Sequence, residues 1–477
     1  MIPPMDISAA AALIKEGELS SVALVSSTLE RLRTVDRHLH AFVTVDAEGA
    51  LTQAERLDRE LQDGRQRGPL HGIPVGIKDI FDVAGMPTKC GCRAFSDVPP
   101  ASTDSTATAR LRQAGAVIVG KTTTHELALG VSTPPTRNPW DLRRSAGGSS
   151  GGSGAAVAAG SIMAALGSDT GGSIRTPSAL CGVVGLKPTY GRVSRAGVLP
   201  LSWSLDHAGA ITRSVADAGL LLEILAGPDA SDPSTLGQPA YNQPVLGNES
   251  LSDRRLGVVP EAFLDPLEES VRNGFEEAVE AARTLGAAIV KVSIPELKWA
   301  LAAEFTIILA EAASYHEELL RMNPELLSED ILTQLQAGHL LPAATYLRAQ
   351  RTRAVIQAAF RKAFDGHCLD GVLTPTVPCT AHLTEQTEQD MLDLSGTEEP
   401  AGQAYVRTTG PANLAGLPAI ALPFKLSPEG LPISVQLLAR PFQERELLRM
   451  AKALHDAAPC GLPWREPAGL GRALETR

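Results

Sequence analysis

Short apolar runs alternate with longer amphipathic stretches along most of the chain. Amphipathic stretches with helical periodicity occur, for example, at residues 105–114 and 267–285. The apolar runs have the length and the branched side chains of buried strands. They lie at residues 72–77, 116–119, 256–259, 288–292, 371–373, 419–422 and 433–438. This alternation predicts an α/β fold in which helices cover both faces of a sheet.

The first 62 residues predict helices. Asp6 is the predicted N-cap of a first helix, which Gly17 ends. Ser20 or Ser21 is the predicted N-cap of a second helix, and a third is expected near residues 50–62.

Two serines lie in separate glycine-rich turns within residues 147–189. Ser149 occurs in GGSSGG and Ser173 in DTGGSIR. Glycine beside a serine lets the backbone approach the side chain closely and leaves N–H groups free to bind a ligand. Small apolar residues join the two turns, and this run predicts a buried helix rather than a flexible linker. We therefore expect the two turns to form two halves of one active site.

Lys78 lies in an apolar segment, residues 73–80, that has the pattern of a buried strand end. Most lysines are exposed, so one interpretation is a solvated side chain paired with Asp79. The other is a buried amine, whose pKa falls because burial disfavours the charged form. A neutral amine can act as a base. The composition of the segment leaves both interpretations open.

Four segments together resemble the motifs of the amidase signature family of serine hydrolases. In chain order they read GIPVGIKD, AGGSSGGSGAAVAAG, GSDTGGSIRTPSALCGVVGLKPTYGRVS and TTGPANLAGLPAIALP. The resemblance extends over nearly the whole chain and implies one large mixed β-sheet enclosed by helices on both faces. It also implies a single domain over residues 1–477. The expected parts are an N-terminal helical arm (1–62), a catalytic core (63–226), an exposed connector rich in Pro, Asn, Gly and Ser (227–253), a variable, mostly helical covering region (254–370) and the C-terminal part of the core (371–477).

The resemblance implies a catalytic triad of Lys78, Ser149 and Ser173, with a cis peptide bond between Gly148 and Ser149. In this mechanism neutral Lys78 draws a proton through the Ser149 hydroxyl, and Ser173 attacks the substrate carbonyl to form an acyl-enzyme. The reaction that it implies is acyl transfer without a histidine.

The loop that carries Ser173 is expected to stabilise the negative charge on the attacked oxygen. The expected N–H donors of this oxyanion hole are Thr170, Gly171, Gly172 and Ser173. Asp169 and Arg175 flank the loop with opposite charges. We interpret them, together with Gly148, as supporting residues that fix the shape of the site. A simple surface ion pair between Asp169 and Arg175 is the alternative.

Two other motif matches point to different chemistry. Residues 115–122, GAVIVGKT, fit the P-loop pattern, but their middle residues Ala-Val-Ile-Val predict a strand rather than a phosphate-binding loop. Residues 147–151 fit the G-x-S-x-G pattern of α/β-hydrolases, which requires a strand before the serine. The preceding NPWDLRRSA is polar and contains proline, so no buried strand is expected there. Both alternatives are disfavoured.

The charge composition limits the classes of molecule that the protein is expected to bind. The chain has 43 Lys and Arg against 54 Asp and Glu, and its formal net charge of −11 disfavours binding to nucleic acid or to an anionic membrane. No signal peptide is recognisable, and the apolar run at residues 155–166 is too short to span a bilayer, so we expect a cytoplasmic protein. The six cysteines have no zinc-finger spacing. We expect reduced thiols at Cys90 and Cys92, no metal and no cofactor. A homodimer is left open.

The resemblance implies a stand-alone amidase that hydrolyses small to medium amides, aryl amides included. The same acyl-enzyme chemistry tolerates esters and carbamates (urethanes). The alternative is the A subunit of a glutamine-dependent tRNA amidotransferase, which supplies ammonia within a complex. The pattern of that subunit has an aspartate seven residues before the asparagine that matches Asn413, and Val406 occupies that position here. An apolar side chain cannot pair with an ammonium group, so Val406 counts against glutamine as the substrate.

The size of the substrate depends on residues 129–138, a segment that borders the substrate entrance in the family and is shorter here. A short border stiffened by Pro134 and Pro135 predicts a wide, largely apolar entrance that favours bulky or aromatic amides. The alternative is that the helical residues 295–365 cover the pocket in its place. The sequence leaves both open.

Overall fold

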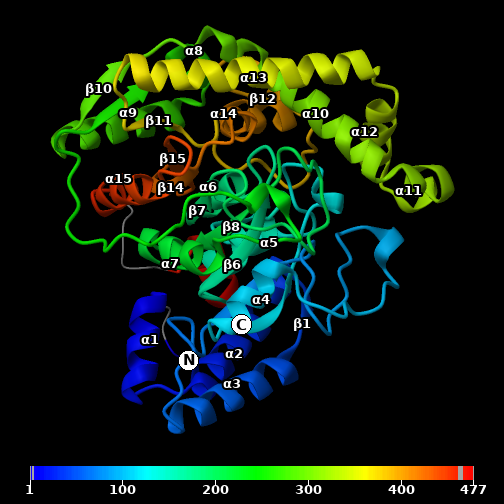
Figure 1. Ribbon diagram of the computed structural model, residues 1–477, viewed down its shortest axis with the longest axis vertical. Helices are drawn as coiled ribbons and strands as arrows, with labels where there is room; N and C mark the ends of the chain where they lie inside the picture. The colour runs from blue at the N-terminus through cyan, green and yellow to red at the C-terminus, as the bar shows by residue number, and fades with distance from the viewer. Residues whose placement is uncertain (1, 3–4, 460–465, 476–477) are drawn as a thin grey trace.

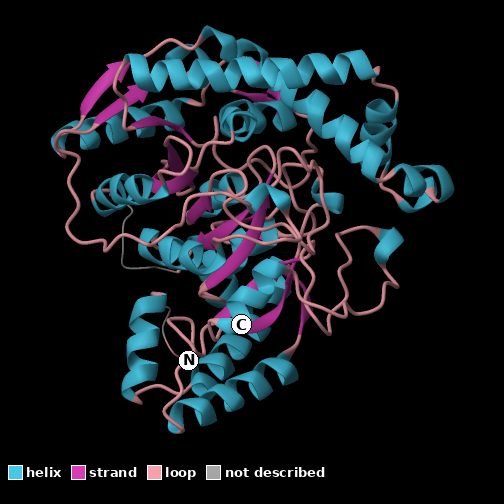
Figure 2. Ribbon diagram, viewed as in Figure 1, coloured by secondary structure: helices cyan, strands magenta, loops and turns pink. Residues whose placement is uncertain are grey.

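The computed structural model describes residue 2 and residues 5–459 and 466–475. Within these residues the main sheet has eleven strands, and helices surround it (Figure 1 and Figure 2). From one edge to the other the strands are β1 (Phe42–Val45), β3 (Val117–Thr122), β2 (Pro74–Lys78), β6 (Ala164–Asp169), β8 (His207–Thr212), β7 (Val184–Lys187), β14 (Ala419–Leu426), β15 (Pro432–Leu438), β11 (Gly371–Pro375), β9 (Arg255–Val258) and β10 (Ala288–Lys291). The expected α/β fold with a large mixed sheet is confirmed.

The sheet has two parallel parts on either side of an antiparallel centre, and its edge strand β1 pairs antiparallel with β3. β2 pairs in parallel with β3 and β6, and β9 pairs in parallel with β10 and β11. Between them, β8, β7, β14 and β15 pair antiparallel. Parallel neighbours need crossover connections, and α4 (Thr106–Gln113) and α9 (Glu269–Thr284) supply two of these. Because β2 and β6 are parallel neighbours, their carboxyl ends share one edge of the sheet, and these ends carry Lys78 and Asp169.

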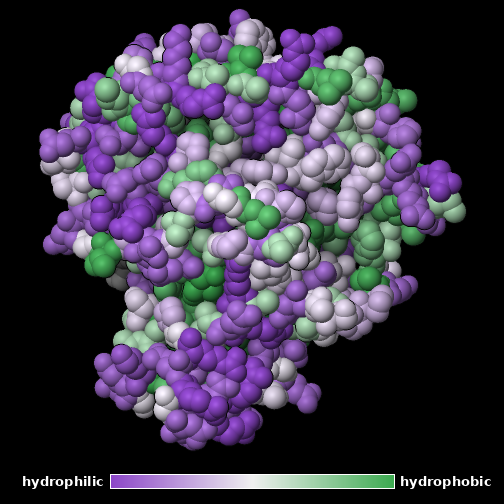
Figure 3. Space-filling view, viewed as in Figure 1, coloured by the Kyte–Doolittle hydropathy of each residue, from purple (hydrophilic) through white to green (hydrophobic). Residues whose placement is uncertain are grey.

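The N-terminal helices α1 (Ile7–Glu16), α2 (Ser21–Leu39) and α3 (Ala47–Gln62) lie together at the bottom of Figure 1. On the face seen in Figure 3, their part of the molecule has a mostly hydrophilic surface. Gly17 ends α1 in the left-handed conformation, with φ +77°, as its position predicts. The Ser20 side chain caps α2 by accepting from the Ala23 N–H, whereas Asp6 occupies the N-cap of α1 without a side-chain capping bond.

Residues 300–366 are mostly helical, and we call the helices that they form the cover. It consists of α10 (Ala300–Tyr315), α11 (Glu317–Met322), α12 (Glu329–His339) and α13 (Ala343–Gly366), and α13 is the long helix along the top of Figure 1. α10 contacts α12, α13 and α14 (Ala401–Ala415), so it joins the cover to the C-terminal part of the chain. The other elements are α5 (Gly151–Ala158), α6 (Arg175–Cys181), α7 (Val215–Leu225), α8 (Pro260–Phe263), α15 (Glu444–Asp456), α16 (Ala468–Glu475) and the short strands β4 (Arg137–Asn138), β5 (Asp141–Ser145), β12 (Met391–Asp393) and β13 (Glu398–Pro400).

One expectation about the segment between the two serine loops is wrong. The small apolar run does not form a single helix: α5 ends at Ala158, and the chain re-enters the sheet as β6 at Ala164. Gly160 has a φ of +63°, which ends the helical path. Ala164 and the residues after it then pair with β2 on one side and with β8 on the other. Sheet pairing on both sides overrides the high helix propensity of alanine, which is only a weak prior.

The small residues of α5 allow very close packing, and Gly152 gives a direct test. A Cβ atom on Gly152 would lie 2.5 Å from the Ala41 carbonyl oxygen and 2.5 Å from the Thr123 backbone nitrogen. We expect Gly152→Ala to lower the free energy of unfolding by about 2 kcal/mol, because backbone atoms cannot move aside cheaply. Gly366→Ala is the matched control, since no heavy atom lies within 4 Å of the position of its added Cβ. Urea denaturation of both variants makes the measurement, and equal midpoints would contradict the close packing.

Candidate active site

Lys78 is the last residue of β2, and it is fully buried. Its Nζ donates to the Ser149 Oγ at 2.7 Å and to the Ser168 Oγ at 2.8 Å. Ser168 comes from β6, the parallel neighbour of β2, and Ser149 comes from the loop before α5. The interpretation of Lys78 as a solvated partner of Asp79 is wrong. The partner of Asp79 is Lys121, whose Nζ lies 2.7 Å from the Asp79 Oδ1.

The surroundings of Lys78 favour its neutral form. Burial lowers the pKa of Lys78 to about 7, against smaller opposing effects of Asp169 and Asp206. Within the described residues, no carboxylate forms an ion pair with the amine, and two hydroxyls are its hydrogen-bond partners. At neutral pH a large fraction of the amines is therefore uncharged and able to take a proton from the Ser149 hydroxyl.

Ser173 lies in the loop after β6, next to the loop that carries Ser149. The Ser150 N–H donates to the Ser173 carbonyl oxygen at 3.2 Å, which ties the two serine loops together. The peptide bond between Gly148 and Ser149 is cis, as the resemblance implied. Ser173 and Gly148 both line one pocket. In this part of the chain the Ser173 Oγ forms no hydrogen bond with the Ser149 Oγ, so the proton relay between the two serines stays a prediction.

The expected oxyanion hole stays a prediction. Among the described residues, the backbone N–H groups of Thr170, Gly171 and Ser173 form no hydrogen bond and remain available to a substrate oxygen. The Gly172 N–H instead donates to the Asp169 Oδ1 at 2.9 Å. Gly172 has a φ of +133°, which favours glycine, so its part in this structure is to shape the turn.

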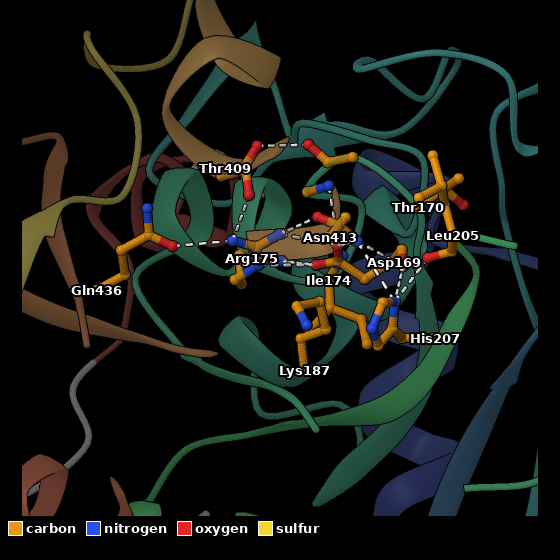
Figure 4. Close-up of polar contacts among 12 residues, drawn as sticks. Asp169, Thr170, Ile174, Arg175, Lys187, Leu205, His207, Thr409, Asn413 and Gln436 are labelled. Atoms are coloured by element: carbon orange, nitrogen blue, oxygen red, sulfur yellow. Dashed lines mark hydrogen bonds and ion pairs between the residues drawn. The ribbon is translucent and has the colours of Figure 1, made fainter. Parts of the chain in front are cut away.

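Asp169 and Arg175 form a fully buried ion pair, shown in Figure 4. The Arg175 guanidinium donates to both carboxylate oxygens of Asp169 at 3.0 Å. It also donates to the Thr409 carbonyl at 2.8 Å, the Gln436 Oε1 at 2.9 Å and the Asn413 Oδ1 at 2.6 Å. Burial alone would raise the pKa of Asp169, but Arg175 holds it well below its usual range. The surface ion pair considered as the alternative is therefore excluded.

The pocket beside Ser173 is a cavity of about 50 Å³. Its apolar wall consists of Ala128, Leu129, Val131, Leu201, Phe305, Ile308 and Val406. Phe305 and Ile308 belong to α10, and Gln334 of α12 also lines the cavity. Residues of the covering helices therefore line the pocket together with Leu129, Gly130 and Val131 of segment 129–138. The width of the entrance stays a prediction.

Sequence reasoning missed several polar residues around this pocket. Ser168 contacts Lys78, and Asp206 accepts from the Thr170 Oγ1 at 2.6 Å. Glu304 of α10 is fully buried, and its carboxylate has no hydrogen-bond partner in the described part of the chain. Glu388 lines the pocket itself. Ser168 had a signal, since it directly precedes Asp169 in GSDTGGS. Neither Glu304 nor Glu388 stands in a motif.

The two competing motif matches find no support. Residues 117–122 form strand β3, and Lys121 of the P-loop pattern is fully buried. The chain before Ser149 forms a hairpin of β4 and β5. This hairpin lies outside the main sheet, so the described segment before Ser149 has no strand of the main sheet, which a nucleophile elbow needs.

Burial raises the pKa of Cys92 to about 12, and both Cys90 and Cys92 are free thiols. Cys460 lies outside the described residues.

The described ranges contain neither a metal-ligand cluster nor a membrane-spanning helix. Their His, Cys, Asp and Glu side chains do not gather in groups of three or more that could hold a metal ion. None of their helices has the length and the apolar character required to cross a bilayer.

The family model described as Amidase matches residues 23–448. The chain belongs to the amidase signature family. An amidase of Pseudomonas putida is 39% identical over 445 residues, covering 93% of this chain and 94% of that protein. The A subunit of the glutamyl-tRNA(Gln) amidotransferase of Prochlorococcus marinus (strain MIT 9303) is 41% identical over 469 residues, covering 92% of this chain and 94% of that protein. The structure of a bacterial aryl acylamidase of the same family has a TM-score of 0.89 at 25% identity, covering 98% of this chain and 99% of that chain. This amidase signature protein is therefore a hydrolase of amide C–N bonds.

The lowered pKa of Lys78 predicts the pH dependence of this amidase. Only the neutral amine accepts a proton, so kcat/KM for an uncharged amide should rise with pH and level off above about 7. Below the pKa we expect a fall of about tenfold per pH unit, as for one essential base. Initial rates from pH 5 to pH 9 with butanamide, which does not ionise in this range, make the measurement. A profile that falls between pH 6 and pH 8 as pH rises would contradict the assignment of Lys78.

Proposed function

We propose that this amidase acts on its own and hydrolyses small to medium amides, aryl amides included, through an acyl-enzyme on Ser173. The observation that carries the proposal is the buried Lys78 amine, 2.7 Å from the Ser149 Oγ and 2.8 Å from the Ser168 Oγ, on the strand that leads into the loop of Ser173. The aryl acylamidase and the Pseudomonas putida amidase support a stand-alone enzyme. We further propose a cytoplasmic location.

The proposed reaction has two halves. Ser173 Oγ attacks the substrate carbonyl carbon, while its proton passes through the Ser149 hydroxyl to the neutral amine of Lys78. The N–H groups of Gly171 and Ser173 stabilise the oxygen that becomes negatively charged, a contribution of about 3 kcal/mol for each well-placed donor. The proton then passes to the leaving amine as the C–N bond breaks. Water repeats the sequence on the acyl-enzyme and releases the acid.

The same steps apply to esters and to carbamates, because only the leaving group differs. An ester or a carbamate presents the same carbonyl carbon to Ser173 and the same developing oxyanion to its loop. We therefore include ester and urethane cleavage among the activities of this site. The small cavity and the apolar side chains of Phe305 and Ile308 favour a compact apolar group next to the carbonyl.

The pocket also supports a stand-alone amidase over an amidotransferase component. Free glutamine carries an α-ammonium group and an α-carboxylate. Val406 lines the pocket where the amidotransferase pattern has an aspartate, so that partner for the ammonium group is missing. Among the described residues that line the pocket there is no lysine or arginine to bind the α-carboxylate. A charged group left unpaired in such a pocket weakens binding strongly.

The proposal predicts the substrate order of the purified chain without partner proteins. We expect kcat/KM for acetanilide to exceed that for glutamine by about tenfold or more, a difference of about 1.4 kcal/mol in transition-state binding. Release of aniline and of ammonia gives the two rates under the same conditions. Ser173→Ala serves as the blank that excludes contaminating activity. Faster turnover of glutamine than of acetanilide would instead favour the amidotransferase function.

A further inference from the structure

Glu388 places a carboxylate in the wall of the active-site pocket. It lies in the segment before β12, and its carbonyl oxygen accepts from the Gly402 N–H at 2.8 Å. The side chain as a whole is 16% exposed, and it lines the cavity together with Ser173.

One oxygen of this carboxylate holds it in place. The Glu388 Oε1 accepts from the Val131 N–H and, at 3.2 Å, from the Ser132 N–H. These two bonds fix the side chain against the loop that borders the pocket. The other oxygen, Oε2, accepts no hydrogen bond from any described residue. It lies 3.7 Å from the position of a Cβ on Gly402, which also lines the cavity.

Among the described residues, one basic side chain lies within ion-pair distance of Glu388. The nearest basic group is His125, whose Nδ1 lies 3.7 Å from Oε1 and is bonded to the Ser132 carbonyl oxygen at 2.9 Å. Asp330 faces it from α12 and adds a second negative charge. Burial is the largest cause that raises the pKa of Glu388. Asp330 also raises this pKa, and His125 lowers it. Apart from His125, no basic side chain of the described residues pairs with this carboxylate.

Gln334 adds a further hydrogen-bond acceptor to the wall of the cavity. The Gln334 amide nitrogen donates to the Asp330 Oδ2 at 2.9 Å, and its carbonyl oxygen receives no hydrogen bond from the described residues. Phe305, Ile308 and Val406 supply apolar surface beside these acceptors. A hydrocarbon chain that ends in a positively charged amino group matches this combination.

We propose that Glu388 selects primary amides whose acyl chain carries a positively charged amino group. This inference rests on the proposed amidase function of the same pocket. The ammonium group donates to the Glu388 Oε2 while the amide carbonyl lies at Ser173. Glutamine also carries an ammonium group, but its α-carboxylate would meet Glu388 and Asp330 without a cation to bind it.

The test compares ω-amino amides with alkyl amides of the same shape. Glycinamide, β-alaninamide, 4-aminobutanamide and 5-aminopentanamide are paired with propanamide, butanamide, pentanamide and hexanamide. For the best chain length we expect kcat/KM of the wild-type protein to be at least about tenfold higher for the amino amide. In Glu388→Gln this ratio should fall to about one or below, because the amide oxygen still accepts from Val131 and Ser132 but carries no charge.

Glu385→Gln is the matched control, because it removes the same charge from an exposed position on the same segment. It should keep the wild-type ratio. If Glu388→Gln lowers kcat/KM for both members of a pair equally, Glu388 acts only on the loop, and the proposal is wrong. A wild-type ratio of one for every pair also overturns it. The ratio should fall on acidification, and earlier than for an ordinary glutamate, because the pKa of Glu388 is raised.

A binding measurement separates this inference from the proposed function. Calorimetry on Ser173→Ala protein gives the Kd of each pair without turnover. We expect binding of the best amino amide to be about tenfold tighter than that of its alkyl partner, and the Ser173→Ala, Glu388→Gln double variant to lose the difference. If that preference is found but the wild-type protein hydrolyses no amide, the proposed function fails and the amino-group site stands. If neutral amides are hydrolysed without any preference in binding, the inference about Glu388 fails and the proposed function stands.

Discussion

The burial of the Lys78 amine between two serine hydroxyls is the constraint on which the active site depends. An ammonium group in that position loses its hydration, and no carboxylate in contact replaces it within the described residues. The amine therefore gives up its proton near neutral pH, at a pKa of about 7. The parallel pairing of β2 with β6 produces this environment, because it sets the end of each strand against the other.

Arg175 pairs with Asp169, the carboxylate that opposes the lowering of the Lys78 pKa most strongly. Asp169 lies close enough to raise the pKa of Lys78, but its own carboxylate is bound by the Arg175 guanidinium through two hydrogen bonds. Hydrogen bonds also join helix α10 of the cover to the loop after β6, which carries Thr170 and Ser173. Glu311 of α10 accepts from the Ser202 Oγ at 2.6 Å, and Asp206 links that turn to Thr170. Charge balance and the position of the oxyanion loop thus depend on segments far apart in the chain.

Local patterns predicted what depends on local interactions. The seven predicted apolar runs all form strands of the main sheet, although β10, at its edge, is exposed or half-buried. Lys78 follows the predicted run 72–77 and is the last residue of β2. β6 was predicted as a helix, because pairing with β2 and β8 is invisible in a run of alanines. Glu388 reaches the pocket from a loop more than 200 residues after Ser173, and a loop glutamate has no periodicity to mark it. Contacts between distant segments, rather than propensities, set these parts of the site.

Covalent labelling with a fluorophosphonate tests the central claim most directly, because the reagent reacts with an activated serine. The account predicts that mass spectrometry finds one adduct, on the peptide that contains Ser173. Labelling should be lost in Ser173→Ala, which should also lose about a thousandfold or more of kcat. Ser178→Ala, a buried serine of α6 whose Oγ donates to the Ile174 carbonyl, is the control that should keep the label. An adduct on another serine, or near wild-type turnover in Ser173→Ala, would contradict the account.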